Sequence, residues 1–74
     1  MTKDQVIEEH DVVTVIEIFT KYDLFGSIVT IAGGSQGTVI ADADTDEPLI
    51  EFAQFGFTKY KEPILVNVPK ANLF

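Results

Sequence analysis

The 74-residue chain contains no cysteine, no arginine and no tryptophan, and it has a single histidine. Without cysteine the chain can form neither a stabilising disulfide nor a thiolate metal site. Because His10 is the single histidine, a metal site with several histidines is excluded as well. No apolar run approaches the roughly 20 residues of a transmembrane helix, and the N-terminus lacks the basic and then apolar order of a signal peptide. We therefore expect an intracellular, cytoplasmic protein that depends on apolar packing.

Positive charge is also scarce, because five lysines stand against 12 acidic residues and leave a net charge of −7. Nucleic-acid binding draws much of its affinity from the neutralisation of phosphates, so this composition argues against a nucleic-acid partner. The same charge opposes binding to an anionic membrane. A protein partner fits better, either a basic protein or a second copy that completes a thin core.

Short β-strands are the elements that the remaining residues predict. Residues 11–19 are rich in valine and isoleucine, which favour sheets over helices. Apolar residues occur there at both odd and even positions, which indicates either a strand covered on both faces or a bulge that shifts the alternation. Further strands are expected at 28–31, 38–43, 49–53 and 64–68, followed by one 3₁₀ turn at 69–72 and a last strand stub.

The connections carry glycine, acidic and aromatic residues. Gly33, Gly34 and Gly37 predict a structural turn between two strands, because glycine adopts positive φ and permits close backbone approach. Four acids and a proline at 42–48 predict a solvated hairpin tip. Residues 20–27 are predicted as a loop too long for a tight hairpin. Its side chains Tyr22, Leu24 and Phe25 are expected to fold back onto the domain.

Two regions flank this pattern. Residues 54–63 are predicted as a second long loop, and residues 1–10 as a polar arm or a short helical turn. Residues 11–74 then form a single domain.

The order of these elements resembles an SH3-like barrel. Residues 27–40, Ser-Ile-Val-Thr-Ile-Ala-Gly-Gly-Ser-Gln-Gly-Thr-Val-Ile, resemble the strand, glycine turn and Gly-Thr-Val segment of KOW-type domains and other small barrels. A small accessory protein of photosystem I and several short bacterial families of unknown function share that outline. Residues 66–73 resemble the closing strand, 3₁₀ turn and final strand of the same barrels. The resemblance implies an all-β, SH3-like barrel of about five short antiparallel strands with one 3₁₀ turn near the C-terminus.

The ligands of these families do not carry over. KOW-type domains that bind RNA are usually basic, whereas this chain is acidic and has no arginine. The groove of peptide-binding SH3 domains usually includes tryptophan, which is absent here. Function therefore has to be argued from the residues themselves.

Three candidate chemical sites give way to simpler interpretations. Asp42, Asp44 and Asp46 alternate like the first ligands of a calcium loop, but Glu47 stands where that loop needs glycine. The glycine-rich segment opens a strand rather than the helix of a phosphate-binding loop. His10 lies among acids without a distinctive serine or any cysteine as nucleophile, so an exposed histidine is the better interpretation.

Aromatic residues in the two long loops are the candidate partner-binding site. The two loops of an SH3-like barrel lie side by side, and aromatic side chains there anchor partners. The alternative is that they plug the ends of the barrel. The candidate residues are Tyr22, Phe25, Phe55, Phe57 and Tyr60, with Lys59 and Lys61 beside them.

The expected function is a non-catalytic protein–protein interaction or accessory module, with no cofactor and no metal. The surface is expected at residues 20–26 and 54–62, and the partner is a protein or a second copy. An alternative is an acidic decoy that masks a basic nucleic-acid-binding protein, which the net charge of −7 suggests. Nothing in the sequence predicts an enzyme.

Overall fold

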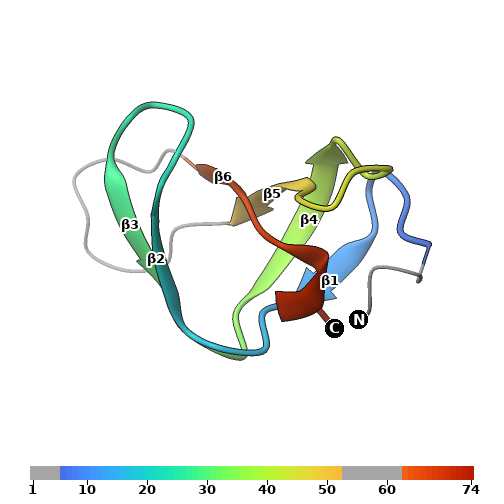
Figure 1. Ribbon diagram of the computed structural model, residues 1–74, viewed down its shortest axis with the longest axis horizontal. Coiled ribbons are helices and arrows are strands. Elements are labelled where there is room, and N and C mark those ends of the chain that lie inside the picture. Colours follow the sequence, from blue (N-terminus) through green and yellow to red (C-terminus); the bar gives the residue numbers. More distant parts are fainter. Residues whose placement is uncertain (1–5, 53–62) are drawn as a thin grey trace.

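The chain folds as an all-β domain in the computed structural model, which describes residues 6–52 and 63–74 (Figure 1). The described residues contain no helix with the length and hydropathy that a bilayer-spanning segment requires. They form six strands, β1 (Val12–Thr14), β2 (Phe19–Tyr22), β3 (Ile28–Ile31), β4 (Gln36–Ala41), β5 (Leu49–Phe52) and β6 (Ile64–Asn67), and a 3₁₀ helix, η1 (Lys70–Asn72). The predicted all-β class and the C-terminal 3₁₀ turn are confirmed.

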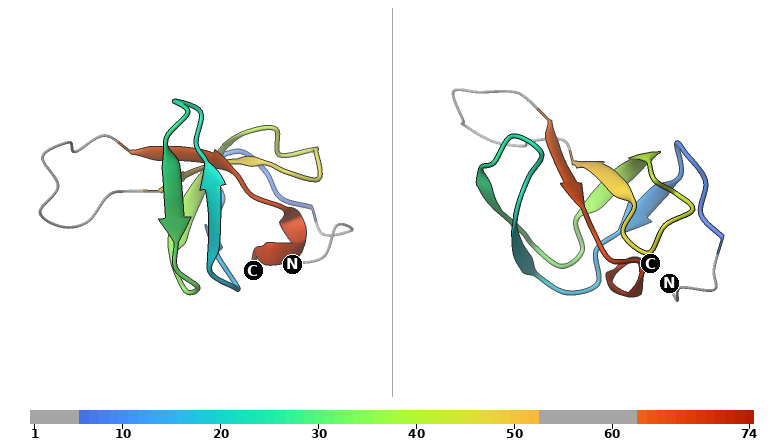
Figure 2. Two further views of the ribbon diagram at one scale, coloured as in Figure 1. Left: turned by 60° about the vertical axis from the view of Figure 1, so that its left-hand side comes forward. Right: turned by 45° about the horizontal axis from the view of Figure 1, so that its top comes forward.

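The strands form two antiparallel sheets. One has four strands in the order β1-β4-β5-β6, and the other is the hairpin β2-β3. The register between β4 and β5 shifts between Val39 and Ala41, which is the signature of a β-bulge. The hairpin lies to one side of the larger sheet (Figure 1 and the right-hand view of Figure 2).

The end of the described chain returns to the first strand. Val15 forms an antiparallel bridge with Leu73, and the backbone groups of Thr14 and Phe74 exchange hydrogen bonds of 3.0 and 2.7 Å. β1 is therefore paired on both edges, with β4 on one side and the last residues on the other. This pairing confirms the strand stub that was expected after the 3₁₀ turn.

A bend at residues 16–18 corrects the single strand predicted over 11–19. Val13 and Val15 point into the core, whereas Ile16 and Ile18 are exposed. The apolar residues at odd and even positions therefore belong neither to a strand covered on both faces nor to a single bulged strand. The chain turns away after Val15 and begins a new strand at Phe19 in the other sheet.

The predicted loop at 20–27 is also corrected. Strand β2 continues through Tyr22 and pairs residue by residue with β3, from Phe19 opposite Ile31 to Tyr22 opposite Ile28. The loop proper is only residues 23–27. Pairing of Tyr22 with Ile28 and of Thr20 with Thr30 favours a strand here, because aromatic, β-branched and threonine pairs stabilise antiparallel neighbours.

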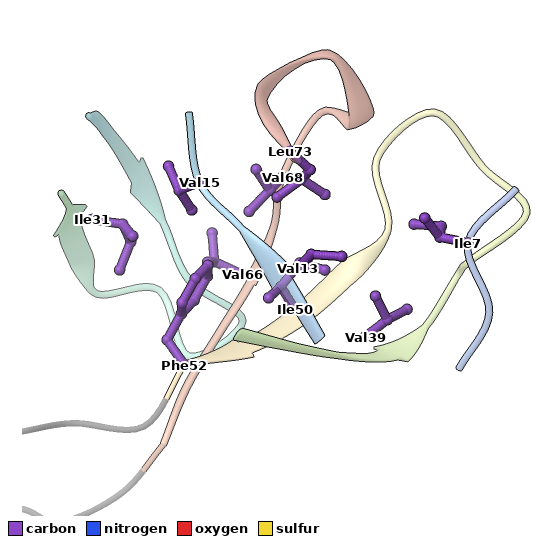
Figure 3. Packing of buried hydrophobic residues seen from close by; sticks show 10 residues of the cluster. All are labelled: Ile7, Val13, Val15, Ile31, Val39, Ile50, Phe52, Val66, Val68 and Leu73. Carbon is purple, nitrogen blue, oxygen red and sulfur yellow. The ribbon is translucent and has the colours of Figure 1, made fainter. Parts of the chain in front are cut away.

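The core lies where the two sheets and the C-terminal segment face one another (Figure 3). Valine and isoleucine dominate it, which suits closely spaced strands. Ile7 is 5% exposed and belongs to the same cluster, so the segment before β1 packs on the domain. The buried residues are Ile7, Val13, Val15, Ile31, Val39, Ile50, Phe52, Val66, Val68 and Leu73.

The glycines predicted for the turn have different physical roles. Gly34 has a φ of 88°, which residues other than glycine rarely adopt. Gly37 lies inside β4 rather than in the turn, beneath two core side chains. A Cβ atom at Gly37 would lie 2.5 Å from Ile50 Cγ2 and 2.9 Å from Phe52. Gly37 therefore gives Phe52 and Ile50 the space that they occupy.

Replacement of Gly37 by alanine tests this packing. We expect Gly37→Ala to lower the free energy of unfolding by about 1–3 kcal/mol, because the added methyl group overpacks the core. Urea unfolding followed by circular dichroism measures the loss. The control is Gln36→Ala at the exposed neighbouring position, and equal stability of the two variants would contradict the proposed role of Gly37.

Candidate functional site

The hairpin β2-β3 gives one face to the core and the other to solvent. Side chains alternate along a strand, and here Ile31 is buried while Phe19 packs on the core cluster. The opposite face carries two cross-strand pairs, Tyr22 with Ile28 and Thr20 with Thr30. The two threonine hydroxyl oxygens lie 2.9 Å apart and share a hydrogen bond.

The loop at the end of the hairpin is organised by one carboxylate. Asp23 Oδ1 accepts hydrogen bonds from the backbone N–H groups of Phe25, at 2.9 Å, and Ser27, at 2.8 Å. The N–H of Asp23 donates to the carbonyl of Ser27, and Gly26 supplies the positive φ of 81°. Short polar side chains often close turns in this way. These hydrogen bonds consequently give the loop a defined shape.

Two contacts hold the hairpin against the larger sheet. The N–H of Leu24 donates to the carbonyl of Leu65 in β6 at 2.9 Å. Lys21 Nζ donates to the carbonyl of Asn67 at 3.0 Å and forms an ion pair with Glu47 Oε1 at 2.6 Å. The pair is half exposed and therefore contributes little by itself, but together these bonds join the hairpin to β6.

Large apolar side chains project from the hairpin into solvent. Tyr22 is 66% exposed, Phe25 67% and Ile28 65%. The expectation that Tyr22, Leu24 and Phe25 fold back onto the domain is therefore wrong, because the backbone bonds of the loop direct these side chains outward. We define the hairpin surface as Ile18, Tyr22, Leu24, Phe25 and Ile28, which are all exposed.

A groove of about 530 Å³ adjoins the hairpin surface at Ile18. One wall is the bend and the start of β2, and the other is the C-terminal 3₁₀ segment. Asn72 fixes the distance between the walls, because its side-chain amide exchanges hydrogen bonds of 2.9 Å with the N–H and carbonyl of Glu17. The groove is lined by Glu17, Ile18, Phe19, Thr20, Lys21, Pro69, Ala71 and Asn72.

Sequence reasoning found part of this site and missed part. It identified Tyr22 and Phe25, which the structure places at one end of the hairpin. It missed Ile18, Ile28 and the groove, because only the bend and the hairpin register bring them to the same surface. The sequence signal for Ile18 was the occurrence of apolar residues at both odd and even positions after Val15. Phe55, Phe57, Lys59, Tyr60 and Lys61 lie outside the described residues.

The other candidates have structural positions. Within residues 6–52 and 63–74, no group of three or more histidine and acidic side chains is placed to hold a metal ion. The carbonyl of Asp42 accepts bonds from the N–H and hydroxyl of Thr45, so the acidic segment forms a turn between β4 and β5. The N–H of His10 donates to Val39 at the start of the β1–β4 pairing.

Removal of the Asp23 carboxylate tests the order of the loop. We expect Asp23→Ala to lower the free energy of unfolding by about 1 kcal/mol, since two hydrogen bonds are lost but the freed N–H groups reach water. Hydrogen exchange at Phe25 and Ser27 should accelerate. Asp44→Ala removes an equal charge from a different turn and serves as the control. Unchanged exchange at Phe25 would contradict this role of Asp23.

Comparison with known proteins adds no independent assignment. No protein-family model matches the chain, and no curated protein or solved structure matches it. The functional argument therefore rests on the geometry of the hairpin and the groove.

Proposed function

We propose that this chain is a non-catalytic protein–protein interaction module of the cytoplasm and that the hairpin surface is its contact with the partner. The observation that carries the proposal is the set of large apolar side chains that the hairpin and its hydrogen-bonded loop hold in solvent. Aromatic side chains on a preorganised backbone bind partners well, because little conformational freedom is lost on binding. The groove beside Ile18 extends the same surface.

The proposal includes an SH3-like barrel as the scaffold. Its support is the order β1-β4-β5-β6 together with the 3₁₀ helix and the return of Leu73 and Phe74 to β1. In such an arrangement the hairpin β2-β3 is a long connection between the barrel strands β1 and β4. A rigid barrel that carries a protruding hairpin suits a role in binding.

The double variant Tyr22→Ser with Phe25→Ser tests the contact. We expect retention of protein partners from the source cell to fall at least about tenfold, because aromatic anchors dominate such interfaces. The melting temperature should stay close to that of the wild type, since both side chains are already exposed. Quantitative affinity capture measures the first effect and circular dichroism the second.

The control for this variant is Gln36→Ser with Glu51→Ser, a pair of exposed strand positions outside the hairpin. Equal retention by the Tyr22/Phe25 variant and the wild type would contradict the proposed surface. Loss of folding in that variant would assign the two aromatic residues to the core instead.

A second candidate function is the acidic decoy, and the distribution of charge favours it. Of the lysines that the structure describes, Lys21 is paired with Glu47 and Lys70 is buried, so neither forms an ion pair with the other surface acids. A basic, nucleic-acid-binding protein would be the partner. The exposed acids are Glu8, Glu9, Asp11, Glu17, Asp42, Asp44, Asp46, Glu47 and Glu51.

Salt dependence separates the decoy from the apolar contact. For a decoy, affinity for the captured partner should fall at least about tenfold between roughly 50 and 300 mM NaCl, because charge attraction is screened. Asp44→Asn with Asp46→Asn should weaken it further, with Glu8→Gln and Glu9→Gln as a control of equal charge. Isothermal titration calorimetry measures each affinity, and binding that is insensitive to salt contradicts the decoy function.

A further inference from the structure

Among the residues that the structure describes, strand β3 has one edge without a paired strand. It pairs with β2 alone, in a sheet of two strands. The N–H of Asp23 bonds to Ser27, and bonded pairs alternate along an antiparallel ladder, so Val29 and Ile31 face β2. The backbone groups of Ile28 and Thr30 therefore point to the opposite edge, where no hydrogen bond from a described residue reaches them.

This edge lacks the features that normally protect one. Natural edges carry charged side chains, proline or a bulge, which prevent pairing with another chain. No charged residue and no proline occurs between Asp23 and Asp42, although the chain as a whole is rich in acids. The β3 sequence, Ile-Val-Thr-Ile, is β-branched throughout and pairs regularly with β2. The edge is thus suited to accept a further strand.

We infer that β3 pairs with β3 of a second copy of this chain, in antiparallel orientation about a two-fold axis. Val29 lies opposite Val29 of the second copy, and Ile28 lies opposite Thr30 of the second copy. Each Ile28–Thr30 pair exchanges two N–H to carbonyl hydrogen bonds, which satisfies every outward group of the two residues. The two hairpins become one continuous sheet of four strands.

A second copy fits this edge for two reasons. Two chains of net charge −7 repel one another, and the segment between Asp23 and Asp42 lets them approach without bringing like charges together. The hairpin sheet has only two strands, and pairing with a second copy extends it to the four strands that are typical of stable sheets. On the outer face each Tyr22–Ile28 pair continues into Thr30 and Thr20 of the second copy.

The inference rests on the proposed function, because it names the partner of the hairpin. It uses the backbone edge, however, while the proposed function uses the side chains of Tyr22 and Phe25. A contact made by one pair of strand edges is small, and small interfaces are weak, so the dimer should appear as the protein concentration rises from about 20 µM to about 1 mM. Sedimentation velocity on the full chain measures the dissociation constant.

Thr30→Pro is the decisive variant, because it removes an outward N–H, and proline is tolerated where a strand edge faces solvent. We expect the dissociation constant to rise at least about tenfold. The control Thr20→Val loses the same hydrogen bond between threonine hydroxyls but leaves the edge intact, so its dissociation constant should stay within about twofold of the wild type.

Hydrogen exchange on the wild type keeps the inference testable if Thr30→Pro does not fold. The amides of Ile28 and Thr30 should exchange more slowly as the concentration rises, because the second copy protects them. A monomer at about 1 mM, or a dimer that Thr30→Pro forms as readily as the wild type, would overturn the inference. Capture of a different protein by a monomeric chain, lost on Tyr22→Ser, overturns the inference alone. A dimer that survives Tyr22→Ser with Phe25→Ser, with no other partner retained, supports the inference and contradicts the side-chain surface of the proposed function.

Discussion

The arrangement of this molecule depends on two hydrogen bonds between the side-chain amide of Asn72 and the backbone of Glu17. The two residues are 55 positions apart in the sequence, and their hydrogen bonds span 2.9 Å in each direction. They fix the bend that ends the path of β1 and directs the chain into the hairpin. The neighbouring bond from the N–H of Ile16 to the carbonyl of Asn72 joins the same two segments. The connection thus lies at the point where the chain passes from β1 in one sheet to β2 in the other.

The site follows from that bend. After Val15 the chain leaves the larger sheet and enters β2 of the hairpin. One face of the hairpin packs on the core through Ile31 and Phe19, and no described residue covers the opposite face. Asp23 then determines the shape of the loop, and Lys21 holds the hairpin toward β6. Apolar exposure in an otherwise acidic chain is thus a result of how the backbone is fixed, and the hairpin surface gathers it on one projecting element.

Local pattern predicted the elements well and their relations poorly. The apolar segments at 28–31, 49–53 and 64–68 all contain strands near the expected bounds, and Pro69 precedes a 3₁₀ helix. Within 11–19, however, alternation cannot reveal a bend whose cause is Asn72. Exposure of Tyr22 and Phe25 was equally hidden, because an aromatic residue in a loop suits a core or a surface. The place of Gly37 depended on Phe52, which only the strand register brings above it.

The closure of β1 by the last residues has a kinetic consequence. Val15 gains its second neighbour only when Leu73 arrives, so the chain must form a very long loop before that contact stabilises it. Topologies dominated by such distant pairings fold in milliseconds to seconds rather than microseconds. The hairpin, by contrast, is local in sequence and forms in about 1–10 µs. The hairpin surface is therefore assembled early in folding, and the pairing of β1 with the last residues forms late.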